Sequence, residues 1–192
     1  LGTISREHGL FLIEDCAEAF GSRYRGKHTG TFGDLATFSF YGNKTITTGE
    51  GGMVVTNDET IHDRAFHLKM HGVAKHREYW HDTLGFNYRM TNICAAIGLA
   101  QLEKAEEKIF RKRRIATWYN EGLERAAVTP HGEIGEVVHS YWMYSVLTAQ
   151  PAVRDALRVH LQRAGIETRP TFFPAHTMPM YAGTYRRLPV AE

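Results

Sequence analysis

The residue of this 192-residue chain with the clearest potential for chemistry is Lys44. It lies in a polar stretch, residues 40–52, which ends in Gly49, Gly51 and Gly52 and is called the lysine loop below. A lysine amine becomes nucleophilic when it is desolvated or placed near other cations, and it then forms Schiff bases with carbonyl groups. Most lysines in turns are surface residues, so Lys44 becomes a candidate only together with other groups.

Asp15 is the second candidate, because it follows a continuous apolar run at residues 10–13. Such a run is typical of a buried parallel strand, and open α/β sheets bind their ligands at the carboxyl ends of these strands. A carboxylate at this position could bind a metal, cap a helix or hold a protonated ring nitrogen. Taken alone, a structural role is the commoner outcome for such a residue.

Ser39 and the glycines of the lysine loop form the third candidate group. Hydroxyl groups and exposed backbone N–H groups are what a bound phosphate requires. The order GxxxxGK[ST] of a P-loop is absent from this stretch, and a glycine run by itself is more often turn chemistry. The sequence therefore offers an amine, a carboxylate and a phosphate cradle, each of them weak alone.

The elements that would position these residues alternate between strands and helices, which favours an α/β fold. Helix 1–8 ends at Gly9, helix 59–70 is capped by Asn57 or Asp58, and a long helix begins at Thr91 or Asn92 and carries a solvated cationic run at 108–114. We expect a short hairpin within 21–34, strands at 10–13, 35–40, 52–56 and 140–147, a helix at 151–164 and a strand-like segment at 166–170.

Composition narrows the function classes. The 23 basic and 21 acidic side chains leave no basic excess of the kind that marks nucleic-acid binding. No apolar run reaches membrane-spanning length, and Cys16 and Cys94 lack the spacing of a disulfide or redox motif, which favours a cytoplasmic location. His67 and His71 stand four residues apart but have no third ligand, so we predict no metal site. The chain lacks an initiating Met, so we expect it to begin inside a longer polypeptide.

The order and spacing of the candidate residues resemble one known family. The sequence is similar to the DegT/DnrJ/EryC1/StrS family of pyridoxal-phosphate (PLP) aminotransferases, which act on nucleotide-linked keto-sugars. The resemblance is carried by IEDCAEAFG at 13–21, GTFGD at 30–34, SFYGNKTITTGEGG at 39–52, GFNYRMTN at 85–92 and GIETRP at 165–170. It covers nearly the whole chain, and the motif at 39–52 is its most specific part.

The resemblance implies the aspartate-aminotransferase fold (fold type I), with residues 1–112 forming the C-terminal part of the large PLP-binding domain. Residues 113–192 would then form the linking helix and the beginning of the small α+β domain. It also implies that Lys44 attaches covalently to PLP, that Asp15 pairs with the ring nitrogen and that Ser39 binds the phosphate. Glu18 stands where many members have Gln, near the cofactor hydroxyl. Asn87 would reach the phosphate from the partner subunit of a homodimer, so that the active site lies at the interface.

The substrates implied by the resemblance are L-glutamate as amino donor and a nucleotide-linked keto-deoxysugar as acceptor. Motifs at 41–48, 78–82, 139–143 and 176–181 favour the subgroup that aminates C4 of GDP-4-keto-6-deoxymannose. Arg89, Arg169 and His176 are candidates for substrate binding, because arginine suits carboxylate and phosphate groups. Each of these three side chains could equally serve a structural role.

Besides Glu18, one further departure and two alternatives belong to this interpretation. Many members have His where this chain has Tyr41. The related sugar 3-dehydratases have His in place of the attaching lysine, so Lys44 favours transamination over dehydration. The alternatives are another sugar outcome, namely 3-amination or dehydration, and a non-catalytic relative of the same fold. We also expect this 192-residue piece, by itself, to bind PLP poorly and to be inactive.

Overall fold

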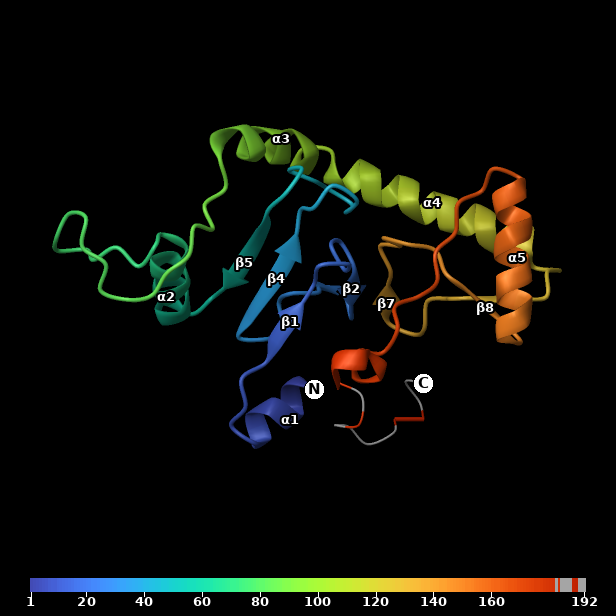
Figure 1. Ribbon diagram of the computed structural model, residues 1–192, viewed down its shortest axis with the longest axis horizontal. Helices are drawn as coiled ribbons and strands as arrows, with labels where there is room; N and C mark the ends of the chain where they lie inside the picture. Colours follow the sequence, from blue (N-terminus) through green and yellow to red (C-terminus); the bar gives the residue numbers. More distant parts are fainter. Residues whose placement is uncertain (182, 184–187, 190–192) are drawn as a thin grey trace. The chain divides into compact units, whose positions relative to one another are not determined.

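The structure, a computed structural model, describes residues 1–181, 183, 188 and 189 and divides into two compact units (Figure 1). The first unit contains residues 1–124 and 132–144. The second contains residues 125–131 and the described residues from 145 onward. The domain boundary expected at 112/113 falls inside helix α4 (Ala105–Leu123), and as a division of the longer protein it stays a prediction.

The centre of the first unit is a three-stranded sheet in the order β1-β4-β5 (Figure 1). Strand β1 (Ile13–Asp15) runs parallel to β4 (Leu35–Ser39), and β5 (Gly52–Thr56) returns antiparallel to β4. Asp15 lies opposite Thr37, so the carboxyl ends of β1 and β4 meet at one edge of the sheet. The predicted strands at 35–40 and 52–56 are thereby confirmed, and this edge carries the candidate residues.

The prediction that the apolar run at 10–13 is a buried strand is only half right. The strand is parallel, as predicted, but it begins at Ile13, and the side chains of Phe11 and Ile13 are 80% and 62% exposed. A two-sided apolar strand needs a covering layer on both faces. The described elements of this chain do not supply both layers.

Glu14 organises the turn that follows the hairpin. Strands β2 (Arg23–Tyr24) and β3 (Lys27–His28) form the predicted hairpin, and β7 (Val137–Val138) pairs with β2. The Glu14 carboxylate accepts hydrogen bonds from the backbone N–H groups of Gly30, Phe32 and Gly33 at 2.6–2.7 Å. These three bonds fix the GTFGD turn against β1.

The helices begin and end at the residues that the sequence indicates. Helix α1 (Gly2–Glu7) is followed by Gly9 at φ 61°, and α2 (Glu59–Lys69) begins at Asp58, whose carboxylate accepts from the N–H of Ile61. Gly72, at φ 64°, follows the end of α2. A left-handed residue after a helix is the usual glycine stop, which confirms these predictions.

The predicted long helix from residue 92 is wrong in one respect, because it is two helices. Helix α3 (Asn92–Leu102) starts at Thr91, whose hydroxyl accepts from the N–H of Cys94, and α4 begins only at Ala105. Lys104, with φ −109° and ψ 13°, leaves the helical region between them. The apolar periodicity continues across this break, so the pattern alone does not reveal it.

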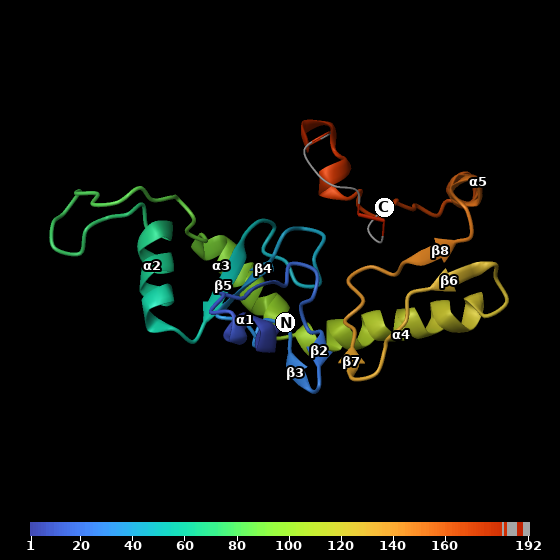
Figure 2. The same cartoon turned by 90° about the horizontal axis from the view of Figure 1, so that it is seen from below.

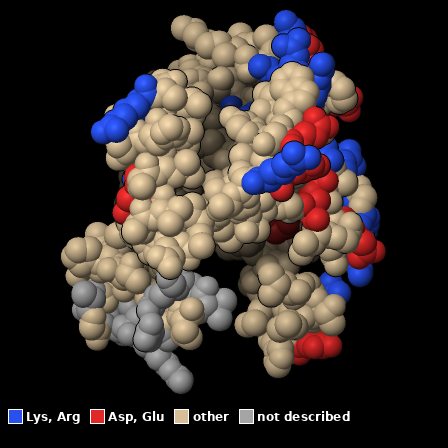
Figure 3. Space-filling view, turned by 90° about the vertical axis from the view of Figure 1, so that its right-hand side faces the viewer, with Lys and Arg blue, Asp and Glu red and all other residues tan. Residues whose placement is uncertain are grey.

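Charged side chains on the surface of α4 have partners of opposite sign. Arg111 contacts Glu107 one turn earlier at 2.5 Å, and Arg113 forms an ion pair with Glu133. On the face drawn in Figure 3, basic and acidic side chains stand next to one another. Lys112 and Arg113, by contrast, are half-buried and donate to backbone carbonyls of residues 142 and 139, so the cationic run at 108–114 is only partly the solvated helix face that the sequence predicts.

The core of the first unit lies under the lysine loop. Phe40, Ile46 and Ala105 are buried and contact each other, and Phe20 and Phe38 pack against them. Phe20 meets Phe38 edge to face, with ring centroids 6.2 Å apart. The loop after β4 is therefore anchored on both sides of Lys44 by buried apolar side chains.

The second unit contains strands β6 (Val128–Pro130) and β8 (Val146–Thr148), which pair antiparallel (Figure 2). Helix α5 (Pro151–Arg163) follows, then the short 3-10 helices η1 (Ala175–Thr177) and η2 (Pro179–Tyr181). Helix α5 confirms the prediction for 151–164. Among the described residues, no helix has the length and apolar character needed to cross a membrane.

Two predicted strands are wrong. Of residues 140–147, only 146 and 147 lie in a strand, because Tyr141 adopts φ 51° and its neighbours bond to other parts of the first unit. Residues 166–170, all of them described, form no strand. At 140–147, tertiary hydrogen bonds outweigh the β-propensity of the residues. At 166–170, no strand among the described residues pairs with the segment.

Candidate active site

Lys44 lies in a half-buried position between an acid and an aromatic ring. Its Nζ is 3.3 Å from Oε1 of Glu18 and 4.0 Å from the ring centroid of Trp142, and its side chain is 13% exposed. A carboxylate and an indole face both attract an ammonium group. The structure therefore brings together Lys44 and Glu18, two of the residues that the sequence singles out.

Hydrogen bonds to its first two residues, which follow β4 directly, fix the shape of the lysine loop. The backbone N–H of Lys44 donates to the carbonyl of Tyr41 at 3.0 Å, and that of Thr48 donates to the carbonyl of Phe40 at 2.9 Å. The hydroxyl of Thr47 also donates to the Phe40 carbonyl, at 3.0 Å. These bonds close the loop over the buried Ile46, so Lys44 is presented by a packed loop rather than by a free one.

Asp15 and Ser39 lie at the carboxyl ends of the two parallel strands. The Oδ1 atom of Asp15 accepts from the N–H of Ala17 at 3.0 Å, and the Ser39 hydroxyl accepts from the N–H of Tyr41 at 3.3 Å. Asp15 is exposed, and the turn that begins at Asp15 carries Glu18 to Lys44. The carboxylate, the hydroxyl and the amine are thus presented at one edge of the sheet.

Glycines at the end of the lysine loop allow close approach of the backbone. A Cβ atom on Gly52 would lie 2.6 Å from the carbonyl oxygen of Phe38, and Gly51 adopts φ 133°. Both positions therefore require glycine, as expected where backbone groups line a phosphate or a tight turn.

Asn87 and Arg89 lie in a segment whose contacts run to the end of α2. The backbone of Asn87 pairs with Met70, and the N–H of Tyr88 donates to the carbonyl of Lys69 at 3.3 Å. Asn87 and Arg89 are exposed. Within the described residues, the contacts of this segment run to α2 rather than to Lys44, and the roles predicted for Asn87 and Arg89 stay predictions.

Arg169 and His176 belong to the second unit. The Arg169 guanidinium contacts Glu167 at 3.0 Å and is largely exposed, and His176 is half-buried in η1. Their surroundings are therefore those of the second unit itself, and the predicted roles in substrate binding stay predictions.

Trp142 contacts Lys44 from a segment that the sequence misassigns. It belongs to residues 139–144, called the tryptophan segment below, which the aromatic pattern predicts to be a strand. The feature of the sequence that could have pointed to Trp142 is the clustering of His, Tyr and Trp in a stretch that resembles the family, and no periodicity marks it.

The two cysteines take no part in this site. Cys16 is buried beside β1, where burial and the nearby Glu14 carboxylate raise the pKa of its thiol, and Cys94 is half-buried in α3. Both are free thiols. Among the described residues, no group of three His, Cys, Asp or Glu side chains is placed to hold a metal ion.

The sequence matches a known protein family over its whole length. A model of the DegT/DnrJ/EryC1/StrS aminotransferase family matches residues 1–192. The chain belongs to this family. The family resemblance predicted from the motifs is therefore confirmed over the full length of the chain.

Within the family, the chain is similar to several named enzymes. The GDP-perosamine synthase of Escherichia coli O157:H7 is 60% identical over 189 residues, which are 98% of this chain and 52% of the relative. The enzyme of the same name from Vibrio cholerae is 53% identical over 91% of this chain and 48% of the relative. The chain thus spans about half the length of these curated relatives.

A solved structure confirms the predicted fold class. The aminotransferase TlmJ from Streptoalloteichus hindustanus superposes with a TM-score of 0.92 at 32% sequence identity, over 99% of this chain and 52% of that one. The aminotransferase PseC from Helicobacter pylori gives the same TM-score at 28% identity. The chain is therefore part of an aminotransferase fold of this family.

Proposed function

We propose that the protein containing this chain is a PLP-dependent aminotransferase that transfers an amino group from L-glutamate to a nucleotide-linked keto-deoxysugar. The acceptor we propose is GDP-4-keto-6-deoxymannose, and the product is GDP-perosamine. The observation that carries this proposal is the placement of Lys44 beside Glu18, at the sheet edge where Asp15 and Ser39 end their strands. The relatives named GDP-perosamine synthase support the choice of sugar.

The residues at this edge fit PLP by their chemistry. Lys44 supplies a primary amine for the aldehyde, Asp15 a carboxylate for the ring nitrogen, and Ser39 a hydroxyl for the phosphate. Gly51 and Gly52 adjoin this edge, where a Cβ atom would meet the Met90 side chain and the Phe38 carbonyl, so both glycines serve the close packing of the backbone beside the proposed site. Bound PLP would supply an electron sink for the carbon that gains or loses the amine.

The chemical work of this chain falls to Lys44 and Asp15. When it is not attached to PLP, the Lys44 amine would be the group that accepts and returns a proton at the substrate carbon, which is general acid–base catalysis. The Asp15 carboxylate would favour the protonated form of the ring nitrogen, because a nearby negative charge favours a positively charged group. Glu18, 3.3 Å from Nζ, restrains the lysine side chain while it is unattached.

The other predicted residues complete the proposed site. Asn87 is assigned a role across a homodimer interface in this proposal, because its side chain is exposed and therefore accessible to a partner subunit. Arg89, Arg169 and His176 bind anionic and sugar groups of the substrates in this proposal. Arginine serves such groups because its fork-like guanidinium matches carboxylate and phosphate oxygens.

Borohydride trapping of the full-length protein tests the proposal. With PLP present, reduction should leave the cofactor's mass on the peptide that contains Lys44. The variant Lys44→Ala should carry no label, and its activity should be lower by about 10²–10⁴-fold or more. The control is Lys75→Ala, since Lys75 is exposed and its ion pair with Asp63, at 3.4 Å, lies on the surface.

Product mass distinguishes amination from dehydration. After incubation with L-glutamate and GDP-4-keto-6-deoxymannose, replacement of the carbonyl oxygen by an amino group supports 4-amination, and loss of a sugar oxygen indicates dehydration. An unmodified Lys44 in full-length protein with PLP present would contradict the proposal and favour a non-catalytic relative.

A further inference from the structure

Trp142 makes two separate contacts with the lysine loop. Its indole Nε1 donates to the backbone carbonyl of Asn43 at 2.9 Å, and its ring face lies 4.0 Å from Nζ of Lys44. One side chain thus holds both the backbone before the lysine and the lysine amine. The indole N–H satisfies its need for an acceptor while the ring attracts the ammonium group.

The backbone of Trp142 is itself held from helix α4. Nζ of Lys112 donates to the Trp142 carbonyl at 3.1 Å. Lys112 is half-buried, and this burial lowers the pKa of its amine. A hydrogen bond from a desolvated donor holds the carbonyl in place, because breaking the bond would leave a buried polar group unsatisfied.

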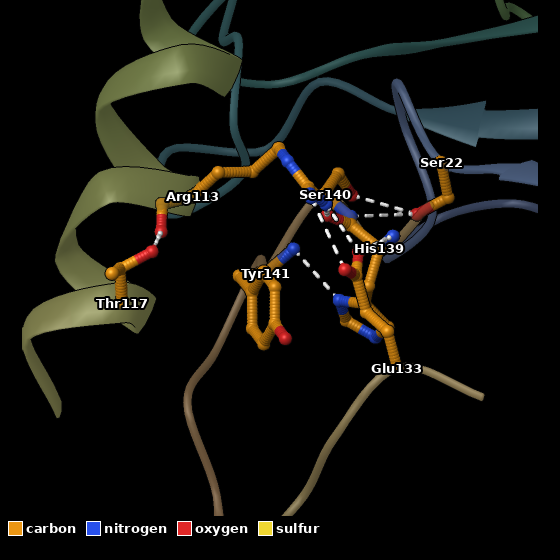
Figure 4. A network of polar contacts seen from close by, with 7 residues as sticks. All are labelled: Ser22, Arg113, Thr117, Glu133, His139, Ser140 and Tyr141. Atoms are coloured by element: carbon orange, nitrogen blue, oxygen red, sulfur yellow. Dashed lines mark hydrogen bonds and ion pairs between the residues drawn. The ribbon is translucent and has the colours of Figure 1, made fainter. Parts of the chain in front are cut away.

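The residues before Trp142 are fixed by a polar network (Figure 4). Ser140 is fully buried, and its N–H and hydroxyl both bond to the hydroxyl of Ser22, at 3.1 and 2.9 Å. The N–H of Tyr141 donates to Nδ1 of His139 at 2.8 Å, and Arg113 donates to the His139 carbonyl at 2.5 Å. Contacts from the β2 region and from α4 therefore meet in the tryptophan segment.

We propose that Trp142 is a positioning residue that holds the Lys44 amine at the sheet edge, ready to attach to the aldehyde of PLP. The inference rests on the proposed function for the identity of the cofactor. The contacts themselves predict that removing the indole face frees the amine, because Glu18 alone then restrains it.

The experiment measures the reactivity of Lys44 in full-length protein freed of PLP. Lysines are reductively methylated for short times, and the label on the Lys44 peptide is divided by that on exposed Lys75. In Trp142→Leu this ratio should rise about three- to ten-fold, the range that corresponds to loss of a partly desolvated cation–π contact. In Trp142→Phe it should stay within about two-fold of wild type, because the aromatic face is kept.

Trp118→Leu is the matched control. Trp118 lies on α4 and contacts the guanidinium of Arg114, 4.8 Å from the ring centroid, so this variant also loses an aromatic–cation contact of the first unit. Its Lys44 to Lys75 ratio should equal that of wild type. If Trp142→Leu does not fold, Trp142→Met is measured in its place, since Met fills the space without a π face.

Two outcomes decide the proposal. A raised ratio in the folded Leu or Met variant, with rescue by Phe, supports it. An unchanged ratio in that variant, or an equal rise in Trp118→Leu, overturns it. Because labelling is done without PLP, failure of the proposed function would show separately, as wild-type protein in which borohydride traps no cofactor on Lys44.

Discussion

At the scale of single residues, Glu133 shows how one carboxylate fixes a functional segment. It forms an ion pair with Arg113 and accepts a hydrogen bond from the backbone N–H of His139 at 2.5 Å. Arg113 in turn donates to the His139 carbonyl (Figure 4). Both polar groups of the His139 backbone are thus bound by one acid–base pair, which sets the start of the tryptophan segment.

This pair predicts a pH dependence of stability. The hydrogen bond from Arg113 lowers the pKa of Glu133 below its usual value of about 4.5. A carboxyl group whose pKa is lower in the folded state stabilises the protein above the unfolded value, and that contribution is lost as pH falls through the folded value. In full-length protein, Glu133→Gln should therefore weaken the loss of stability below about pH 4.5.

The measurement is urea unfolding at pH 7 and at several values between pH 5 and pH 3. Glu133→Gln should be less stable than wild type at pH 7, and the two curves should converge as the pH falls. Glu121→Gln, on the exposed surface of α4, serves as the control and should run parallel to wild type. Curves of wild type and Glu133→Gln that stay equally separated at every pH would contradict the assigned pairing.

At the scale of elements, the packing of α3 against the lysine loop depends on a glycine. A Cβ atom on Gly98 would lie 2.7 Å from Cγ2 of Thr48, which is buried and whose hydroxyl bonds to the carbonyl of Glu50 at 2.7 Å. Thr48 therefore has little freedom to move aside. Gly122 in α4 meets nothing within 4 Å of the same added atom.

These two helical glycines predict opposite effects of one substitution. Gly122→Ala should stabilise the full-length protein by about 0.5–1 kcal/mol, because alanine loses less conformational entropy in a helix. Gly98→Ala should destabilise it by about 1–3 kcal/mol, the usual cost of overpacking, and should disturb the lysine loop. Thermal unfolding checks both changes. A stabilising Gly98→Ala would show that α3 does not press on Thr48.

At the scale of the whole molecule, the described chain leaves large apolar side chains uncovered. Phe11, before β1, and Ile13, in β1, are exposed. Helix α3 contains no buried residue, and its apolar side chains Ile93 and Leu99 are 75% and 61% exposed. Apolar patches of this kind mark surfaces that another segment or chain covers. Since the chain spans about half the length of its relatives, the remaining half is a source of such cover.

The isolated 192-residue chain should therefore behave differently from the full-length protein. We expect it to bind the dye ANS strongly, to self-associate and to trap no PLP on Lys44 with borohydride, because its sheet lacks a covering layer. The full-length protein under the same conditions is the control and should show weak dye binding. A PLP absorbance band in the isolated chain that disappears in Lys44→Ala would contradict this expectation.

The sequence by itself determined the local elements and the family. Asp58, Gly9 and Gly72 marked helix ends, and strand periodicity located β4 and β5, because these signals act between near neighbours in the chain. The motif around Lys44 predicted the family, since the spacing of the amine, hydroxyl and glycines is a property of the chain order.

Only the tertiary structure decided which distant residues meet. Trp142 lies 98 positions after Lys44, and Ser140 bonds to Ser22 across 118 positions, so no periodic pattern could reveal either contact. The same long-range bonds override the β-propensity of the tryptophan segment, which is why the predicted strand at 140–147 is mostly a loop. Long-range contacts depend on how elements pack, and packing is not encoded in neighbour-to-neighbour propensities.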